Sequence, residues 1–553
     1  MIHFFPLTFI AGLLAASLPA HTFADAPPYG AADFVPTPDR PIGFRGDGSG
    51  HFPGATPPRT FSGKDGKNVL WSVKMPSWGQ SSPIVVGKHV ITMAEPDTTI
   101  GIDADTGKVL WQDALGLFSK ERTGSVSLWC GNGYSWPCSD GQRAIKAWIN
   151  SRGSKGGTAA AIVCYDLTTG KRLWLIEFSG DHQKHKFTRE ANRWAWKKFD
   201  GAAAITQHTD WAPAGYASPQ MYGDTVIYQA KGAGSVVALD SKTGAQRWAS
   251  KPSVFGHSGA DANFLLLRVA SRDLLVTNIG TVLDPRSGDV LGEAIPSVEK
   301  DGQRVSRLWG AMEITTKGEV KVAGLSPITG PGAPGVVAFG PDWPRADAAG
   351  AEGAEPSGKS PYHYLAVRLG FDAQGKLTTN CLFPQRTVVP KFEYGNAHMT
   401  ILQDRLLVMP GYGRTLAAIA LDTGQLVIPP KPLWPMPPQA RGWGLKPDAN
   451  APDIKAGLEE FGLTIDDVTN EGRGIGRAGY NSYSRSFVDG RGYIWTMNRQ
   501  AQIYRIDPTK DFAAELAGGL VHPECWTSTA SPVPHGNRIY VRTFGRLACI
   551  GEK

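Results

Sequence analysis

The sequence predicts an all-β protein built as a single β-propeller of four-stranded antiparallel blades. Three observations favour this fold: a nine-residue motif that occurs three times, a second pattern that precedes several motif copies, and a high content of turn-forming residues. Glycine and proline number 66 and 41 in a chain of 553 residues. This content lies below the range typical of disordered proteins and fits a turn-rich β protein.

The nine-residue motif has the form Asp-x-x-Thr-Gly-x-x-x-Trp and predicts a hairpin tip. The aspartate can accept hydrogen bonds from turn amides, the glycine tolerates positive φ, and an apolar strand ending in tryptophan follows. The three copies contain Asp103, Gly107 and Trp111; Asp166, Gly170 and Trp174; and Asp240, Gly244 and Trp248.

A Ser-Pro pair followed by an apolar run, a turn and a second apolar run precedes the tips, most clearly at Ser82, Ser218 and Ser531. Together with the tip and its flanking strands, this pattern gives four antiparallel strands per unit, which is the unit of a propeller blade.

Weaker tips at Asp284, Asp372, Asp422 and Asp507 bring the number of tips to seven. The last unit, from Ser531 to Ile550, has only three strands, whereas the strand of residues 68–75 has no tip before it. That strand can supply the missing fourth strand and leave no exposed edge. We therefore predict an eight-bladed propeller closed by an N-terminal strand.

Residues 1–26 are expected to be a secretory signal peptide, because an apolar run from Phe4 to Ala16 precedes the small-x-small sequence Ala24 to Ala26. No lysine or arginine precedes the run, and the alternative is a buried apolar terminus. Residues 27–67 are expected to form an extended lead-in, and residues 68–553 the propeller. We predict a periplasmic or secreted protein that does not span the membrane. No cysteine precedes Cys130, so no lipid-anchor cysteine is expected.

The formal net charge of +7 is spread along the chain without a dense basic run, which argues against a nucleic-acid partner. Long insertions are predicted at about residues 112–157, 176–214, 326–361, 427–479 and 512–527. In an antiparallel four-stranded blade, the loop between strands two and three and the link to the next blade lie opposite the tips. The insertions should therefore elaborate the face opposite the tips, and function usually concentrates on such loops.

The short loops between strands two and three should surround the mouth of the central channel on that face. They carry five cations and one carboxylate, Glu95. We interpret them as a mouth that binds a carboxylate, a phosphate or an acidic peptide; the alternative is ordinary solvated charge. The predicted ligand-binding cations are Lys231, Arg414, Arg499, Arg542 and Arg546.

Cys130 and Cys138 flank a glycine-rich segment and are the disulfide candidates, either bridged or free. No cysteine and histidine spacing is typical of zinc, and His182 and His185 lack a third ligand, so no metal site is expected.

The tips and their tryptophans resemble the pyrroloquinoline-quinone-type (quinoprotein-like) propeller repeat, and the resemblance covers about residues 42–553. It implies that the tip tryptophans dock between neighbouring blades. The family includes quinone-dependent alcohol dehydrogenases and exported, non-enzymatic propellers such as the outer-membrane assembly lipoprotein. The lead-in from Phe44 to Gly50, followed by Pro57 and Pro58, resembles uncharacterised exported members.

The resemblance implies that an enzyme of this family would use an adjacent cysteine pair, a tryptophan beneath the quinone, calcium ligands and an aspartate. This chain has no adjacent cysteines, and no segment matches the calcium ligands. No nucleophile elbow, P-loop or zinc-protease motif occurs either. We therefore expect a non-enzymatic exported scaffold that binds a protein, peptide or cell-envelope ligand through its insertion-rich face and needs no cofactor. The alternative is an alcohol or sugar dehydrogenase that uses pyrroloquinoline quinone and calcium.

Overall fold

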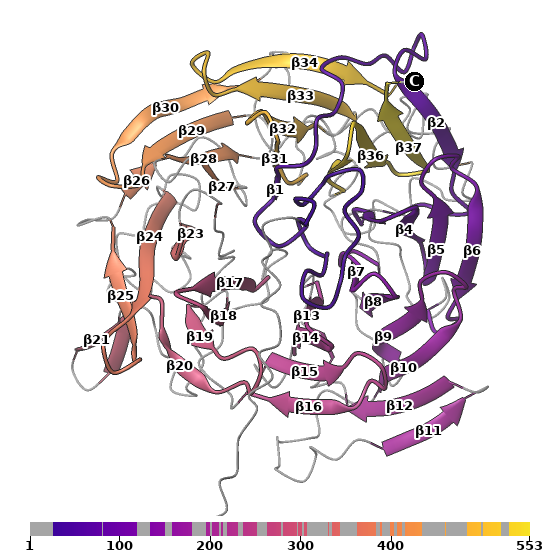
Figure 1. Cartoon of the computed structure of the whole chain (residues 1–553), viewed down its shortest axis with the longest axis horizontal. Coiled ribbons are helices and arrows are strands. Elements are labelled where there is room, and N and C mark those ends of the chain that lie inside the picture. The colour runs from indigo at the N-terminus through magenta and orange to yellow at the C-terminus, as the bar shows by residue number, and fades with distance from the viewer. Residues whose placement is uncertain are drawn as a thin grey trace, which may run out of the picture.

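The structure is a computed structural model of the whole chain, and it describes the ranges given at the end of this paragraph. This part of the chain is all-β, and eight of its sheets contain four or more strands. The sheets are arranged around a common centre, as in a β-propeller (Figure 1). None of the described ranges forms a helix with the length and apolar character needed to cross a bilayer. The ranges are 26–79, 81–118, 133–149, 158–179, 195–199, 202–208, 212–213, 218–230, 236–250, 263–277, 280–295, 297–300, 303–306, 330, 334–342, 362–382, 387–389, 399–402, 406–411, 415–433, 459, 484–498, 501–520 and 530–552.

Four sheets have the simple order expected of a blade, in which each strand pairs antiparallel with the next along the chain. The first strands of three of these sheets, β13, β17 and β27, lie nearest the centre of the ring (Figure 1). Their strands are β3 (Ile84–Val86), β4 (His89–Ala94), β5 (Thr98–Asp103) and β6 (Val109–Ala114); β13 (Gln220–Tyr222), β14 (Thr225–Gln229), β15 (Val236–Asp240) and β16 (Gln246–Ala249); β17 (Leu265–Val269), β18 (Arg272–Val276), β19 (Thr281–Leu283) and β20 (Val290–Glu293); and β27 (Thr400–Leu402), β28 (Leu406–Gly411), β29 (Thr415–Ala420) and β30 (Leu426–Pro432).

Three further sheets carry additional or differently connected strands, and a separate two-stranded hairpin stands apart from them. In one sheet β1 pairs parallel with the innermost strand, and in another β12 pairs parallel with β10. The strands are β1 (His51–Phe52) with β31 (Phe487–Asp489), β32 (Ile494–Met497), β33 (Gln502–Asp507) and β34 (Ala513–Gly519); β7 (Cys138–Ser139), β8 (Arg143–Ile149), β9 (Thr158–Asp166), β10 (Arg172–Ser179), β11 (Ala195–Phe199) and β12 (Ala202–His208); β23 (Val336–Asp342), β24 (Tyr362–Phe371), β25 (Leu377–Cys381) and β26 (Thr387–Val389); and the hairpin of β21 (Ser297–Lys300) and β22 (Gln303–Ser306).

The remaining sheet joins the two ends of the repeat region. Strand β2 (Val69–Lys74) pairs antiparallel with β37 (Arg546–Gly551), and β37 continues to β36 (Arg538–Arg542) and β35 (Val533–His535). The strand predicted at residues 68–75 therefore pairs with the last strand of the chain, and closure of an eight-bladed ring stays a prediction.

The glycine of each of the three full tips lies against a tryptophan of the preceding sheet, as the resemblance implied. A Cβ atom at Gly170 would lie 2.4 Å from Trp111, and φ at this glycine is +68°. A side chain is therefore excluded twice, by the backbone conformation and by the indole ring. The same contact joins Gly244 to Trp174. The indole N–H of Trp111 also donates to the Leu167 carbonyl at 2.9 Å.

Strand β2 takes part in this docking. Trp71 packs on Gly107, where a Cβ would lie 2.8 Å from the ring, and its N–H donates to the Ala104 carbonyl at 3.1 Å. Trp71 thus makes with the first tip the contact that Trp111 makes with the second, which is the contact expected of a fourth strand.

The serines of the Ser-Pro pattern form hydrogen bonds between neighbouring sheets. The Ser82 hydroxyl accepts the N–H of Ser531 at 2.7 Å, and the Ser531 hydroxyl accepts the N–H of Arg485 at 2.6 Å. The Ser218 hydroxyl accepts the N–H of Trp136 at 2.9 Å. Because the residue before proline is held extended, each serine is oriented toward the neighbouring sheet. The tryptophans therefore join neighbouring sheets at their fourth strands, and the serines join them beside their first strands.

Several described strands lie within the ranges predicted as insertions. β7 and β8 lie within the predicted insertion 112–157, and β34 lies within 512–527. β7 has only two residues, β8 contains the buried Lys146, and β34 has a single buried residue, so none gives a clean apolar pattern. Other strands within predicted insertions are β11, β12, β23 and most of β30.

Candidate functional site

The predicted basic mouth is only partly within the described residues. Lys231, Arg414 and Arg499 lie outside them, so their role stays a prediction. The Nε of Arg546 donates to the Ser72 hydroxyl at 2.9 Å, which links β37 to β2.

Arg542 lies in a different environment from the one predicted, because its side chain is 0% exposed. Its guanidinium donates to the carbonyls of Phe544 at 3.0 Å, Met93 at 3.1 Å and Ser77 at 3.3 Å. Burial lowers the pKa of Arg542 to about 9. This arginine bridges the last sheet to the β3–β6 sheet and presents no exposed donor to a ligand.

The carboxylate predicted at the mouth, Glu95, is also buried. It accepts the N–H of Gly133 at 2.8 Å. Nearby, the ammonium of Lys146 donates to the Gly133 carbonyl at 2.7 Å and the Ser135 hydroxyl at 3.0 Å. Burial lowers the pKa of Lys146 to about 7. A buried lysine within an apolar strand was not predicted, because a charged residue in a sequence normally indicates a solvent-exposed position.

Of the two predicted disulfide cysteines, Cys138 lies within the described residues. Cys138 is a buried thiol on β7, and burial raises its pKa. Cys130 lies outside the described residues, so its pairing with Cys138 stays a prediction.

The lead-in crosses the face that carries the tips. It contacts the turns between first and second strands, which emerge on the same side of a blade as the tips. The Gly536 N–H donates to the Gly30 carbonyl at 2.6 Å, and the Gly490 N–H to the Ala55 carbonyl at 2.8 Å. A Cβ at Gly141 would lie 2.0 Å from the Pro36 oxygen. The lead-in, predicted only as extended, is therefore a folded cover.

Part of this cover enters the centre of the ring at the segment from Phe44 to Phe52, which we call the plug. Arg45 is 3% exposed, and its Nη1 donates to the Met399 carbonyl at 3.2 Å. Phe44 packs edge-on against Trp136 at 5.3 Å, and the Arg485 guanidinium lies 5.4 Å from the Phe44 ring centre. The plug thus contacts several innermost segments at once.

The plug needs its alternating glycines. Gly46, Gly48 and Gly50 all have positive φ, and a Cβ at Gly50 would lie 2.3 Å from the Arg45 guanidinium. Burial, with the charge of Arg485, lowers the pKa of Arg45 to about 9. The glycines at 46, 48 and 50 were the signal in the sequence that something packs closely here.

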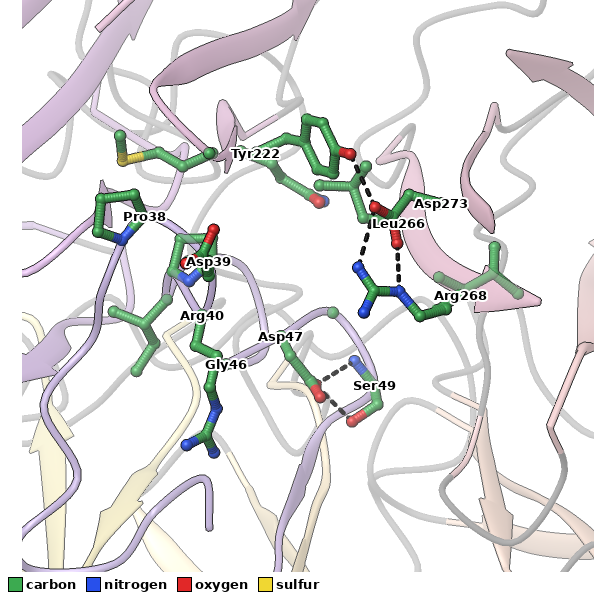
Figure 2. Close-up of a pocket in the computed structure, with 18 of the residues that line it drawn as sticks. Pro38, Asp39, Arg40, Gly46, Asp47, Ser49, Tyr222, Leu266, Arg268 and Asp273 are labelled. Carbon is green, nitrogen blue, oxygen red and sulfur yellow. Dashed lines mark hydrogen bonds and ion pairs between the residues drawn. The ribbon is translucent and has the colours of Figure 1, made fainter. Parts of the chain in front are cut away.

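A half-open cavity of about 1010 Å³ lies between the lead-in and the β13–β16 and β17–β20 sheets. Figure 2 shows Pro38, Asp39, Arg40, Asp47 and Ser49 along the lead-in side and Tyr222, Leu266, Arg268 and Asp273 on the blade side. The sequence did not predict this site, because its two walls are more than 150 residues apart in the chain.

Asp273 organises the charged wall of the cavity. Its carboxylate accepts the Tyr222 hydroxyl at 2.7 Å, Nε of Arg268 at 2.6 Å and Nη2 of Arg286 at 3.4 Å (Figure 2 shows the first two). Burial and this hydrogen bond raise the pKa of Tyr222 to about 12. Arg268 and Arg286 are 63% and 69% exposed, so they keep N–H groups available to a ligand. These two exposed guanidinium groups give the cavity hydrogen-bond donors for a ligand.

A sequence profile described as "Outer membrane protein assembly factor BamB" matches residues 60–189 and 151–317, which include all three full tips. The chain therefore contains the pyrroloquinoline-quinone-type propeller repeat and resembles the BamB family. No curated protein matches the chain.

Solved structures similar to the chain include BamB from Moraxella catarrhalis, which is 13% identical over 88% of this chain and 99% of its own, with a TM-score of 0.44. The quinohemoprotein alcohol dehydrogenase ADHIIG from Pseudomonas putida HK5 is 14% identical over 66% and 68%, with a TM-score of 0.32. A europium-containing methanol dehydrogenase is 13% identical over 83% and 72%, with a TM-score of 0.38. These values are too low to assign a function.

Within the described part of the chain, no three or more His, Cys, Asp and Glu side chains gather in a way that could hold a metal ion. The expectations that no metal and no quinone bind stay predictions.

Proposed function

We propose that this chain is an exported, eight-bladed, closed propeller that acts as a scaffold and binds a protein, peptide or cell-envelope ligand through the face opposite the tips. The pairing of β2 with β37 and the docking of Trp71 on Gly107 support the closed ring. The match to a family named for outer-membrane protein assembly supports a scaffold role in the cell envelope.

One observation carries the choice of face. The lead-in covers the tip side of the ring, where Phe44 and Arg45 fill the space between innermost segments. A ligand that approaches the channel therefore has more room on the opposite side, where the long loops of the repeat are expected.

The test compares two variants, each of which reverses three positive charges. We expect K231E/R414E/R499E to abolish capture of envelope proteins by the immobilised chain, because it reverses the proposed basic mouth. The matched control K108E/K171E/K242E alters three exposed tip lysines, and it should capture the same proteins as the wild type. Equal capture by both variants would remove the proposed face.

The dehydrogenase alternative has its own test. Purified protein is mixed with pyrroloquinoline quinone and calcium, and we expect neither a bound-quinone absorption band nor dye-linked alcohol oxidation. A bound band with oxidation would replace the scaffold proposal.

A further inference from the structure

The cavity beside the lead-in is lined by both signs of charge in equal number. Among the described residues that line it, four aspartates are matched by four arginines. A balanced lining favours neither an acidic nor a basic ligand. The ligand is therefore selected by which of these charges remain available, and on which wall of the cavity they lie.

The lead-in wall offers carboxylates. Asp39 and Asp47 both line the cavity and are exposed to it. Burial within the ring raises the pKa of Asp47, so a cation beside this carboxylate is favoured. Arg40, on the same wall, is already engaged by the lead-in, because its Nη2 donates to the Pro27 carbonyl at 2.7 Å and its guanidinium lies 5.0 Å from the centre of the Tyr29 ring.

The blade wall offers guanidinium groups. Arg247 is occupied by two aspartates, at 2.5 and 2.8 Å, and is not available to a ligand. Arg268 and Arg286 share the single carboxylate of Asp273, at 2.6 and 3.4 Å, and their side chains are 63% and 69% exposed. Both therefore keep N–H groups that a ligand can use.

The available charges of opposite sign face each other across the cavity. Figure 2 shows Asp39 on the lead-in side and Arg268 on the blade side, with no interaction drawn between them. The two groups still influence each other, because the pKa of Arg268 is raised first by its hydrogen bond with Asp273 and in smaller part by the charge of Asp39. A ligand that spans this gap needs a cation at one end and an anion at the other.

The space between the two walls also has apolar surface. The cavity volume of about 1010 Å³ lies at the upper end for small-ligand sites, and Met221, Leu266 and Leu267 belong to the lining. A matching ligand has charged ends separated by several bonds and apolar groups between them. A short peptide with free termini has this chemistry, whereas a phospholipid head group carries both charges at one end of a long apolar molecule.

We propose that the cavity binds a short peptide with free termini, whose ammonium group lies against Asp39 and Asp47 and whose carboxylate lies against Arg268 and Arg286. Charge-assisted hydrogen bonds at both ends supply the selectivity, and the apolar lining accepts small apolar side chains. The proposed scaffold function does not depend on this site, because the cavity lies on the side of the ring that the lead-in covers.

The probe is tri-alanine in four forms: with free termini, N-acetylated, C-amidated, and blocked at both ends. Calorimetry at pH 6.5 measures the four affinities, because both free termini are charged at this pH. We expect the free form to bind most tightly and each blocking group to weaken binding about tenfold.

Two charge-removing variants assign each end of the peptide to a wall. D39N/D47N should bind the free and N-acetylated forms equally, while C-amidation still weakens binding about tenfold. R268Q/R286Q should show the reverse, with equal binding of the free and C-amidated forms. A purely structural effect of either variant would weaken all four forms alike.

The controls are D33N on the lead-in and R272Q on the β17–β20 sheet, which lie outside the cavity lining and should bind like the wild type. The proposal is overturned if free tri-alanine does not bind or binds like the doubly blocked form, if either double variant weakens all four forms alike, or if phosphoethanolamine binds more tightly than the free peptide. Should a double variant fail to fold, D39N or R286Q replaces it, because both side chains are exposed.

Discussion

Two innermost strands, β31 and β17, occupy the same position in their blades but differ in what covers them. β31 is wholly buried under β1, whereas β17 borders an open cavity and keeps two leucines half-exposed. At the outside of the ring the N-terminal region also covers β37, through β2. The comparison teaches that the N-terminal region adds strands to some sheets of the repeat, whereas none of its described residues pairs with β17.

The largest loss of stability is expected from removing strand β2. Deletion of residues 68–75 exposes the edge of β37 and leaves the first tip without Trp71, so the free energy of unfolding should fall by more than about 5 kcal/mol. Chemical denaturation measures this change. A deletion variant that unfolds at the wild-type denaturant concentration would refute closure by β2.

A smaller loss is expected when the plug is disturbed. Gly50→Ala forces a side chain into the Arg45 guanidinium at a φ of +77°, and we expect a loss of about 3 kcal/mol. Gly66→Ala is the control, because φ there is +68° with nothing within 4 Å, so only about 1 kcal/mol should be lost. Equal losses would show that the plug is not tightly packed.

Lowering the pH should destabilise the fold at the pairing of β1 with β31. Burial, followed by the charge of Arg45, lowers the pKa of His51 from 6.5 to about 4. Between these values the unfolded state binds more protons, so stability should fall as pH decreases from about 6.5 to 4, by up to about 3 kcal/mol.

Denaturation at pH 7 and pH 4.5 measures this change. His51→Gln should remove this part of the pH dependence; a slope that persists in the variant would assign it to another group.

The smallest effect is expected in strand β17. Leu266→Ala in β17 should reduce the free energy of unfolding by about 1 kcal/mol, because this leucine is already half-exposed. Leu402→Ala in β27, which is 7% exposed, should cost about 2 to 5 kcal/mol. Thermal unfolding of both variants tests whether β17 is open in solution; equal losses would mean that it is covered.

The repeat made the fold predictable, because the tip needs Asp103, Gly107 and Trp111 at fixed spacing for reasons that hold in every copy. The pairing of β2 with the last unit followed from counting strands. Packing between distant segments was not predictable: Arg542 was expected at a mouth but is buried, and Arg45 enters the centre of the ring. A buried cation is indistinguishable in sequence from an exposed one, since only its neighbours in the fold satisfy its donors.

The pairing of β2 with β37 also sets the order of events in folding. Arg546 donates to the Ser72 hydroxyl across 474 residues of chain, so this sheet cannot form until the last strand is available. Contacts of such long sequence separation form slowly, because the loop between them must first be closed. During that delay β2 has no partner strand, so its edge is exposed to pairing with another molecule.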